Sequence, residues 1–360
     1  MNYIIDTHSK IPLYIQLYNQ IKNDIVMGAY PYHSKLPSKR TIASDLGISV
    51  VTVQHAYELL CDEGYIEARK RSGFFIIFRR TDGFITTEKH SELHHHQHHR
   101  EDRFAFPFSV LAKTMRKIIS DQGSDILAKT PHAGLPEFRE IIKQYLARNR
   151  GIYVDIEQII IGSGAEYLYS LIVTLLGKER KFAIEWPSYE KIEGVYKNAG
   201  IQYAPLPLVS DGIDSNALAQ TQATVLHVSP FRSFPSGVMA SASKKYEYIR
   251  WGQTPHRIII EDDFESEFTI LSKPEETLFT LTKNDNVIYL NTFSKTISPS
   301  LRTGYMVLPK SLIKPFYEKL SFISCPVPTF QQLLLAQLIS NGDFEKHINR
   351  IRRIKRKTTV

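Results

Sequence analysis

Helical and alternating patterns of apolar residues divide the first part of the chain. Apolar residues recur at helical spacing between Pro12 and Met27, which predicts a first helix. Two shorter helices follow, because Ser38 and Ser49 can each cap a helix and a glycine between those helices allows a tight turn. Apolar and polar residues then alternate over residues 65–78 around a basic turn, as in a β-hairpin. The pattern predicts a small, mostly helical domain that ends in a hairpin.

From Phe104 onward, strand-like and helix-like patterns alternate, which predicts an α/β domain. Short apolar runs that we interpret as buried strands cover residues 158–161, 225–230, 257–262 and 286–290. Polar or charged residues follow each run. Because ligands bind at the carboxyl ends of the strands in a mostly parallel sheet, we expect a site along that edge.

The segment between these two parts has neither periodicity. Its residues 89–100 are rich in histidine. We interpret the segment as a solvated linker, with nickel or zinc binding by the histidines as the alternative. The predicted domain limits are 1–78, 79–103 for the linker and 104–360.

The net charge of +8 does not by itself predict a nucleic-acid partner. Seven Lys and Arg residues and no acid lie between Lys346 and Val360, so only +1 remains for the rest of the chain. The two cysteines, Cys61 and Cys325, have neither metal-type spacing nor the number needed for a disulfide framework. The N-terminus lacks a basic stretch followed by an apolar run, so we expect a cytosolic protein with no predicted metal site.

A lysine and an aspartate follow two of the predicted strands. Lys295 comes after the run at 286–290, and Asp262 ends the run at 257–262. A lysine amine can hold an aldehyde as a Schiff base, and a carboxylate can keep a pyridine nitrogen protonated. In addition, residues 162–165 join a strand to a helix and can present backbone N–H groups to a phosphate. These features suggest a site for pyridoxal 5′-phosphate.

The first domain closely resembles the winged helix-turn-helix of GntR-type bacterial regulators. The resemblance rests on Leu36-Pro37-Ser38, the basic residue Lys39, the Gly47 turn, Thr52-Val53, Ala56-Tyr57 and Glu63-Gly64. It implies that the second helix of the pair enters the major groove of DNA, while basic residues bind phosphates. The residues expected at the DNA are Lys39, Arg40, Ser49, Thr52, Gln54, Arg69 and Arg71.

The recognition helix differs from many members of this family at two positions. Val50 and Gln54 stand where those members carry arginine. Gln54 can read adenine and a valine can contact a thymine methyl group, so we expect an operator that is not led by guanine here. For the first domain as a whole, the alternative to DNA binding is a helical hairpin used for dimerisation or protein binding.

The second domain resembles the fold-type I aminotransferases and, with the first domain, the MocR/GabR group of regulators. The landmarks are Gly134-Leu135-Pro136, Ser163-Gly164-Ala165, Pro187-Ser188-Tyr189, Phe234-Pro235-Ser236-Gly237, Glu261-Asp262-Asp263, Ser266-Glu267-Phe268, Thr292-Phe293-Ser294-Lys295, and Leu301-Arg302 with Gly304-Tyr305. The resemblance implies a homodimer that binds operator DNA, pyridoxal phosphate and a small amine or amino-acid effector. It also implies roles for individual residues: Lys295 forms the Schiff base, Asp262 pairs with the pyridine nitrogen and Tyr189 stacks on the ring. The phosphate is expected beside Ser163, Gly164, Ala165, Thr292, Ser294 and Arg302.

Three departures from the family bear on function. Phe264 stands where members usually have a tyrosine that donates to the cofactor's phenolic oxygen, and Arg232-Ser233 replaces histidine-glutamine. We also expect the fold to be truncated at its C-terminus, without the small domain whose arginine binds a substrate carboxylate, so transamination is not expected. A sensing regulator is the leading hypothesis. The alternatives are a working aminotransferase with a DNA-binding appendage and a regulator in which only DNA binding is intact.

Overall fold

The computed structural model describes residues 3–7, 9, 11–70, 72–79, 105–264, 266–269 and 276–358. The chain divides into two compact units, Met1–Gln97 and His98–Val360, and each is described by itself. The predicted linker lies outside the described residues apart from Arg79.

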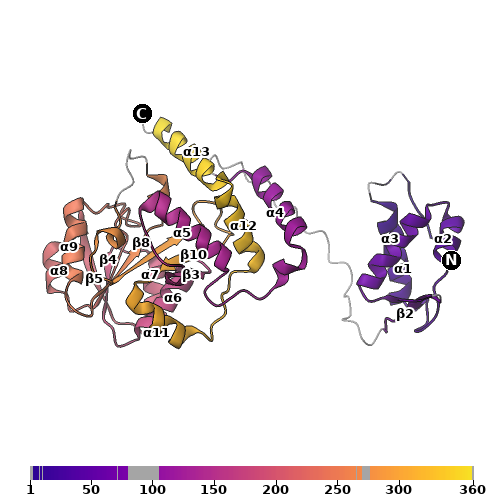
Figure 1. Cartoon of the computed structure of the whole chain (residues 1–360), viewed down its shortest axis with the longest axis horizontal. Helices are drawn as coiled ribbons and strands as arrows, with labels where there is room; N and C mark the ends of the chain where they lie inside the picture. The colour runs from indigo at the N-terminus through magenta and orange to yellow at the C-terminus, as the bar shows by residue number, and fades with distance from the viewer. Residues whose placement is uncertain are drawn as a thin grey trace. The chain divides into compact units, whose positions relative to one another are not determined.

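The first unit consists of three helices and a two-stranded antiparallel hairpin. Its elements are α1 (Leu13–Val26), α2 (Lys39–Leu46), α3 (Val50–Asp62), β1 (Ile66–Arg69) and β2 (Gly73–Ile76) (Figure 1). The core side chains that are fully excluded from solvent include Leu17, Ile21, Val53, Tyr57 and Leu60. Because these residues recur every three or four positions, each helix turns one apolar face inward. The predicted order of helices and hairpin is confirmed.

Local capping residues fix where α2 and α3 begin. The Ser38 side chain accepts a hydrogen bond from the Thr41 amide, and Ser49 accepts one from the Thr52 amide. Gly47 ends α2 with a φ of 64°, a conformation that glycine adopts without steric cost. Both serines therefore satisfy amide groups that the helices leave unpaired, and the glycine allows the sharp turn between the helices.

The second unit contains an eight-stranded sheet with the order β3-β10-β9-β8-β7-β4-β5-β6. The strands are β3 (Ile159–Gly162), β4 (Phe182–Trp186), β5 (Tyr203–Val209), β6 (Gly212–Ile213), β7 (Val225–Val228), β8 (Ile258–Asp262), β9 (Val287–Thr292) and β10 (Gly304–Val307). Strands β5, β4, β7, β8 and β9 pair in parallel, whereas β10 is antiparallel to both of its neighbours and β6 is antiparallel to β5. The carboxyl ends of five strands therefore meet along one edge.

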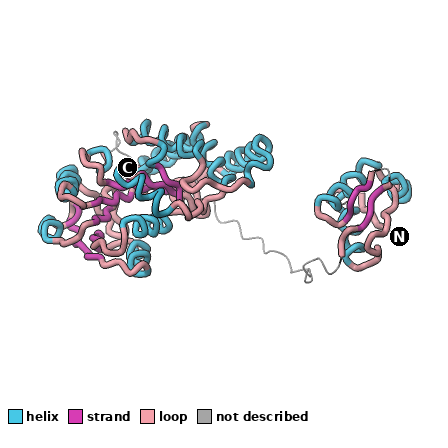
Figure 2. The backbone as a smooth tube through the Cα atoms, turned by 60° about the horizontal axis from the view of Figure 1, so that its bottom comes forward, coloured by secondary structure: helices cyan, strands magenta, loops and turns pink. Residues whose placement is uncertain are grey.

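Helices cover both faces of this sheet, as Figures 1 and 2 show. One face packs against α6 (Ala165–Leu176), α7 (Glu190–Asn198) and α11 (Lys310–Leu320). The other face packs against α5 (Pro136–Arg150), α8 (Ser215–Gln220), α9 (Ala242–Gly252), α10 (Leu278–Leu281), α12 (Thr329–Ser340) and α13 (Asp343–Thr358), with α4 (Phe108–Gln122) packed outside α12. Short 3₁₀ turns cover Gly123–Leu127, Ile156–Gln158 and Ser266–Phe268.

Alternating residues of the central strands point into these two layers. Ile258, Ile260, Ile288 and Leu290 belong to one core cluster, while Ile259 and Val287 belong to the opposite one. Because both faces are covered, the first three or four residues of β8 and β9 are buried on both sides of the sheet, and polar residues follow only at the carboxyl ends of these strands. The predicted α/β class is confirmed. In the part of the chain that the structure describes, we find no helix with the length and apolar character to cross a membrane.

Candidate cofactor site

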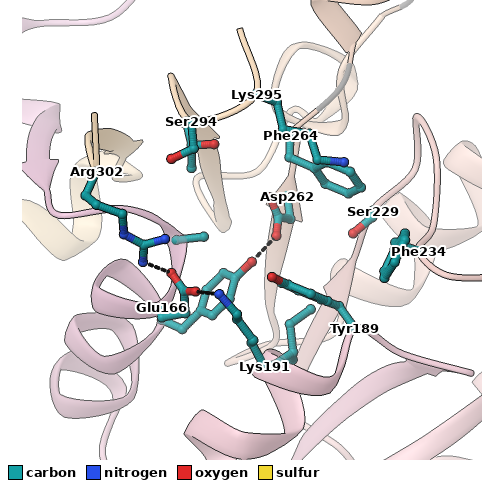
Figure 3. Close-up of a pocket in the computed structure, with 14 residues that line it drawn as sticks. Glu166, Tyr189, Lys191, Ser229, Phe234, Asp262, Phe264, Ser294, Lys295 and Arg302 are labelled. Atoms are coloured by element: carbon teal, nitrogen blue, oxygen red, sulfur yellow. Dashed lines mark hydrogen bonds and ion pairs between the residues drawn. The ribbon is translucent and has the colours of Figure 1, made fainter. Parts of the chain in front are cut away.

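A pocket with a volume of about 230 Å³ lies at the carboxyl ends of the strands. Figure 3 shows the side chains that line it. They come from β8 and β9, from the loops that follow β7, β8 and β9, from the first two turns of α6 and from the start of α7. The lining residues are Ala165, Glu166, Tyr169, Tyr189, Lys191, Ile192, Ser229, Phe234, Asp262, Phe264, Thr292, Ser294, Lys295 and Arg302.

Most of the residues predicted for the cofactor line this one pocket. They are Lys295, Asp262, Tyr189, Ala165, Thr292, Ser294 and Arg302. Two others, Ser163 and Gly164, are not among the lining residues but form the turn before α6. Gly164 has a φ of 84°, and a Cβ atom placed on it would lie 3.2 Å from Nη2 of Arg302. A glycine at this turn therefore gives the Arg302 guanidinium room to approach the backbone.

Asp262 ends β8 and is only 3% exposed. Its Oδ2 atom accepts a hydrogen bond from the hydroxyl of Tyr169 on α6 and lies 3.7 Å from Nε2 of His227. His227 is held in turn by the hydroxyl of Tyr196, 2.7 Å from Nδ1. The other carboxylate oxygen, Oδ1, is buried and has no partner among the described residues. A buried acceptor requires a donor, and a protonated pyridine nitrogen has the chemistry to supply one.

The amino group of Lys295 lies among aromatic rings in the same pocket. Its Nζ atom is 4.6 Å from the ring centroid of Phe264 and 5.9 Å from that of Phe234. Both distances allow a cation to be attracted by the face of a ring. Phe264 therefore contacts the lysine through the face of its ring and offers it no hydrogen-bonding group.

Tyr189 lies at the start of α7, directly before its first residue. Its ring meets that of Phe234 edge to face, with 5.6 Å between the ring centroids and an interplanar angle of 85°. This arrangement fixes the orientation of the Tyr189 ring, because aromatic pairs favour edge-to-face contact. The tyrosine thus forms one wall of the pocket.

A group of charged side chains lies at the α6 end of the pocket. Nη2 of Arg302 is 2.5 Å from Oε2 of Glu166, and Nζ of Lys191 donates to Oε1 of the same carboxylate (Figure 3). Burial alone would raise the pKa of Glu166, but the hydrogen bonds from Lys191 and Arg302 outweigh that effect and lower it. Glu166 is therefore negatively charged at neutral pH.

Several residues of the site carried no signal in the sequence. Tyr169 and Glu166 are three positions apart on α6, a spacing that places both on one side of a helix, but only the fold shows that this side faces Asp262.

Arg232 is exposed and does not line the pocket. Its neighbour Ser233 is buried and donates to Glu185 at 2.6 Å. The Arg232-Ser233 departure thus affects a buried carboxylate.

The residues expected at DNA lie on α2, at the start of α3 and on β1. Lys39 and Arg40 begin α2, Ser49 and Thr52 form the cap of α3, and Arg69 ends β1. Arg71 lies outside the described residues.

The exposed start of α3 is apolar or neutral. Val50 and Val51 are 43% and 60% exposed, and Gln54 lies beside them. Nε2 of Gln54 donates to Glu58 at 2.8 Å, and Nζ of Lys39 lies 3.5 Å from Oε1 of Gln54. Helix α3 contains neither lysine nor arginine. The basic residues predicted to contact DNA therefore lie outside α3, with Lys39 and Arg40 on α2 and Arg69 on β1.

Two family models match the chain. The model for bacterial regulatory proteins of the gntR family matches residues 13–76, and the model for aminotransferase class I and II matches residues 102–360. An HTH-type transcriptional regulator of Bacillus subtilis (strain 168), YdeL, itself uncharacterized, is 33% identical over 96% of this chain and 77% of its own length. The chain belongs to the MocR-type regulators of the gntR family.

Other MocR-type relatives match over similar lengths. The probable rhizopine catabolism regulatory protein MocR of Rhizobium meliloti is 27% identical over 98% of this chain and 76% of its own length. The pyridoxine biosynthesis regulator PdxR of Corynebacterium glutamicum is 25% identical over 98% and 78%. These matches confirm the prediction that the chain is a DNA-binding regulator with an aminotransferase-like domain.

Solved aminotransferases share the fold of the second unit. The kynurenine aminotransferase of Pyrococcus horikoshii superposes with a TM-score of 0.63 at 25% identity, covering 69% of this chain and 64% of that one. The α-aminoadipate aminotransferase LysN of Thermus thermophilus gives the same TM-score at 24% identity, covering 70% of this chain and 65% of that one. This MocR-type chain thus spans slightly less than two thirds of the length of those enzymes.

Proposed function

We propose that the aminotransferase-like domain of this regulator binds pyridoxal 5′-phosphate through Lys295 and senses a small amine or amino acid. One observation carries the proposal. Lys295 and Asp262 line one pocket, and Asp262 offers a buried oxygen without a partner among the described residues, while its other oxygen is held by Tyr169.

Residues around the pocket match the different parts of the cofactor. Asp262 would accept the proton of the pyridine nitrogen, and Arg302 with Ser294 and Thr292 would hold the phosphate. Tyr189 would lie against the ring. When bound, the cofactor supplies an aldehyde that combines reversibly with primary amines.

The surroundings of Lys295 favour an effector that is partly apolar. Phe234 and Phe264 lie beside Nζ of Lys295, so a small amine that reaches this position would contact two aromatic rings. Burying an apolar portion against these rings would contribute about 25 cal/mol per Å² of apolar surface. An amine with a hydrocarbon or aromatic portion is therefore the effector class that the pocket suits.

An absorbance titration with pyridoxal 5′-phosphate tests the cofactor proposal. The parent protein is expected to develop a near-ultraviolet or visible band that a Lys295→Ala variant does not develop. Lys314→Ala is the matched control, because Lys314 is exposed on α11 and pairs only with Glu318 among the contacts described. The same band in the parent and in Lys295→Ala, or no band in either, would rule out Lys295 as the attachment point.

We also propose that the regulator acts as a homodimer on operator DNA. A dimer would place two copies of α3 on successive major grooves, so its operator would contain two half-sites. Sedimentation of the purified protein, alone and with a duplex carrying two half-sites, tests this. A monomer on the duplex would contradict the proposal.

A working aminotransferase is the second candidate, because Lys295 and Asp262 share the pocket. Incubation with amino-acid donors and a keto-acid acceptor distinguishes the two functions. A sensing domain is expected to change its absorbance with an effector amine but to release no keto acid over many turnovers.

A further inference from the structure

One carboxylate binds both cations at the α6 end of the pocket. Glu166 lies in the first turn of α6, Lys191 lies in the first turn of α7, and Arg302 comes from the loop before β10. Glu166 receives Arg302 on one oxygen and Lys191 on the other (Figure 3). The two cations therefore already have an anionic partner.

This is the place where the proposed function puts the phosphate. Gly164 brings the Arg302 guanidinium close to the turn that begins α6. A phosphate bound there would need the same donors that Glu166 holds. A phosphate and the Glu166 carboxylate are both negative, so they would repel each other if they shared these donors. The Glu166 side chain is only 24% exposed, so solvent screens this repulsion poorly.

Protonation does not relieve this conflict at neutral pH. The hydrogen bonds from Lys191 and Arg302 outweigh burial and lower the pKa of Glu166. Glu166 thus stays charged and has to be displaced from Arg302 and Lys191 when a phosphate enters.

We propose that Glu166 competes with phosphate for Arg302 and Lys191, and that it thereby sets the affinity of the pocket for a phosphate monoester. Once displaced, Glu166 leaves Lys191 as a second cation for the phosphate. The inference rests on the proposed function of the pocket. Because Glu166 competes with the phosphate, we expect the bound cofactor to exchange readily. The fraction of protein that holds the cofactor would then follow the concentration of free cofactor.

Equilibrium titration of the full-length protein with pyridoxal 5′-phosphate tests the proposal. Glu166→Gln keeps the size and polarity of the side chain and removes its charge, so the Kd is expected to fall ~10-fold relative to the parent. Glu193→Gln is the matched control, because Glu193 pairs with Lys197 on α7 and does not line the pocket. Its Kd is expected to equal that of the parent.

A second variant tests the role of Lys191. Adding Lys191→Met to Glu166→Gln is expected to raise the Kd several-fold, since the phosphate would then lose one cation. Inorganic phosphate, used as a competitor, is expected to follow the same order of affinities across the variants. This order distinguishes an effect at the anion site from a general change in the pocket.

The outcomes separate this inference from the proposed function. An unchanged or higher Kd in Glu166→Gln, with a band that still requires Lys295, would overturn the role of Glu166 alone. Absence of cofactor binding in every protein tested would overturn both proposals. An unchanged Kd on adding Lys191→Met would overturn the role of Lys191.

Discussion

At the scale of single residues, the site depends on how Asp262 is held. The hydroxyl of Tyr169 satisfies Oδ2, which leaves Oδ1 for a ligand. Both oxygens are in an interior where an unpaired acceptor is costly. The tyrosine therefore fixes which oxygen is offered to the pocket.

Replacing Tyr169 with phenylalanine is expected to weaken both stability and cofactor binding. The variant leaves Oδ2 without its closest donor, a loss of about 1–3 kcal/mol for a buried hydrogen bond to a charged group. Urea denaturation and cofactor titration measure the two effects. Tyr167→Phe is the control, because Tyr167 lies on the same helix without a described hydrogen bond to Asp262. Equal loss in both variants would show that the hydrogen bond from Tyr169 to Asp262 makes no specific contribution.

Glu185 gives the stability of the second unit a dependence on pH. Burial raises its pKa from 4.5 to about 7, although hydrogen bonds from Ser233 and Ser229 oppose the shift. Between these two values the unfolded chain loses the proton while the folded chain keeps it. The stabilisation present below pH 4.5 is therefore lost as the pH rises to about 7.

The variant Glu185→Gln is expected to flatten this part of the pH dependence. Urea denaturation at a series of pH values between 4.5 and 7 measures the slope. Glu190→Gln, an exposed position on α7, serves as the control and is expected to retain the parental slope. A parental slope in Glu185→Gln would show that other groups cause the dependence.

At the scale of elements, the strand ends could be predicted from the sequence and the helix contributions could not. Lys295 and Asp262 follow apolar runs, and strands of that kind end on the same edge of a parallel sheet. Tyr169, Glu166 and Lys191 instead reach the pocket because α6 packs over β9 and β10 and α7 packs against α6. Local periodicity contains no information about strand order, so these residues became visible only in the fold.

The same limit applies to β10. Gly304-Tyr305 stood out in the sequence only as part of a family landmark, yet β10 lies between β3 and β9 and is antiparallel to both. The sequence predicted a mostly parallel sheet, and no local pattern distinguishes a parallel strand from an antiparallel one when both faces are buried. The position of Arg302, just before β10, depends on this insertion.

Helix α3 allows a prediction about operator sequence. Its exposed start offers Val50, Val51 and Gln54, which suit thymine methyl groups and adenine. Val50→Arg is expected to move the preference toward guanine at one base pair of each half-site, by about 1–3 kcal/mol. Selection from a randomised duplex library measures the change.

The control for this prediction adds the same charge elsewhere. Asn19→Arg places an arginine on an exposed position of α1. It is expected to raise the affinity for all duplexes without altering the preferred bases. The same preferred bases in Val50→Arg and the parent would contradict the assignment of α3 as the reading helix.

At the scale of the whole molecule, the chain combines a DNA-binding unit with an aminotransferase-like unit. The first unit has the capped helices and hairpin of a gntR-family domain. The second keeps the strand edge on which Lys295 and Asp262 meet. In a regulator built in this way, we expect occupancy of the cofactor pocket to change the affinity of the first unit for operator DNA.

Chemical trapping tests the central claim most directly. The full-length protein is incubated with pyridoxal 5′-phosphate, treated with borohydride to make the attachment permanent, digested and analysed by mass spectrometry. We predict a single modified residue, Lys295, in the parent protein and no modified lysine in Lys295→Ala. Modification of other lysines with Lys295 untouched, or no modification at all, would contradict the account.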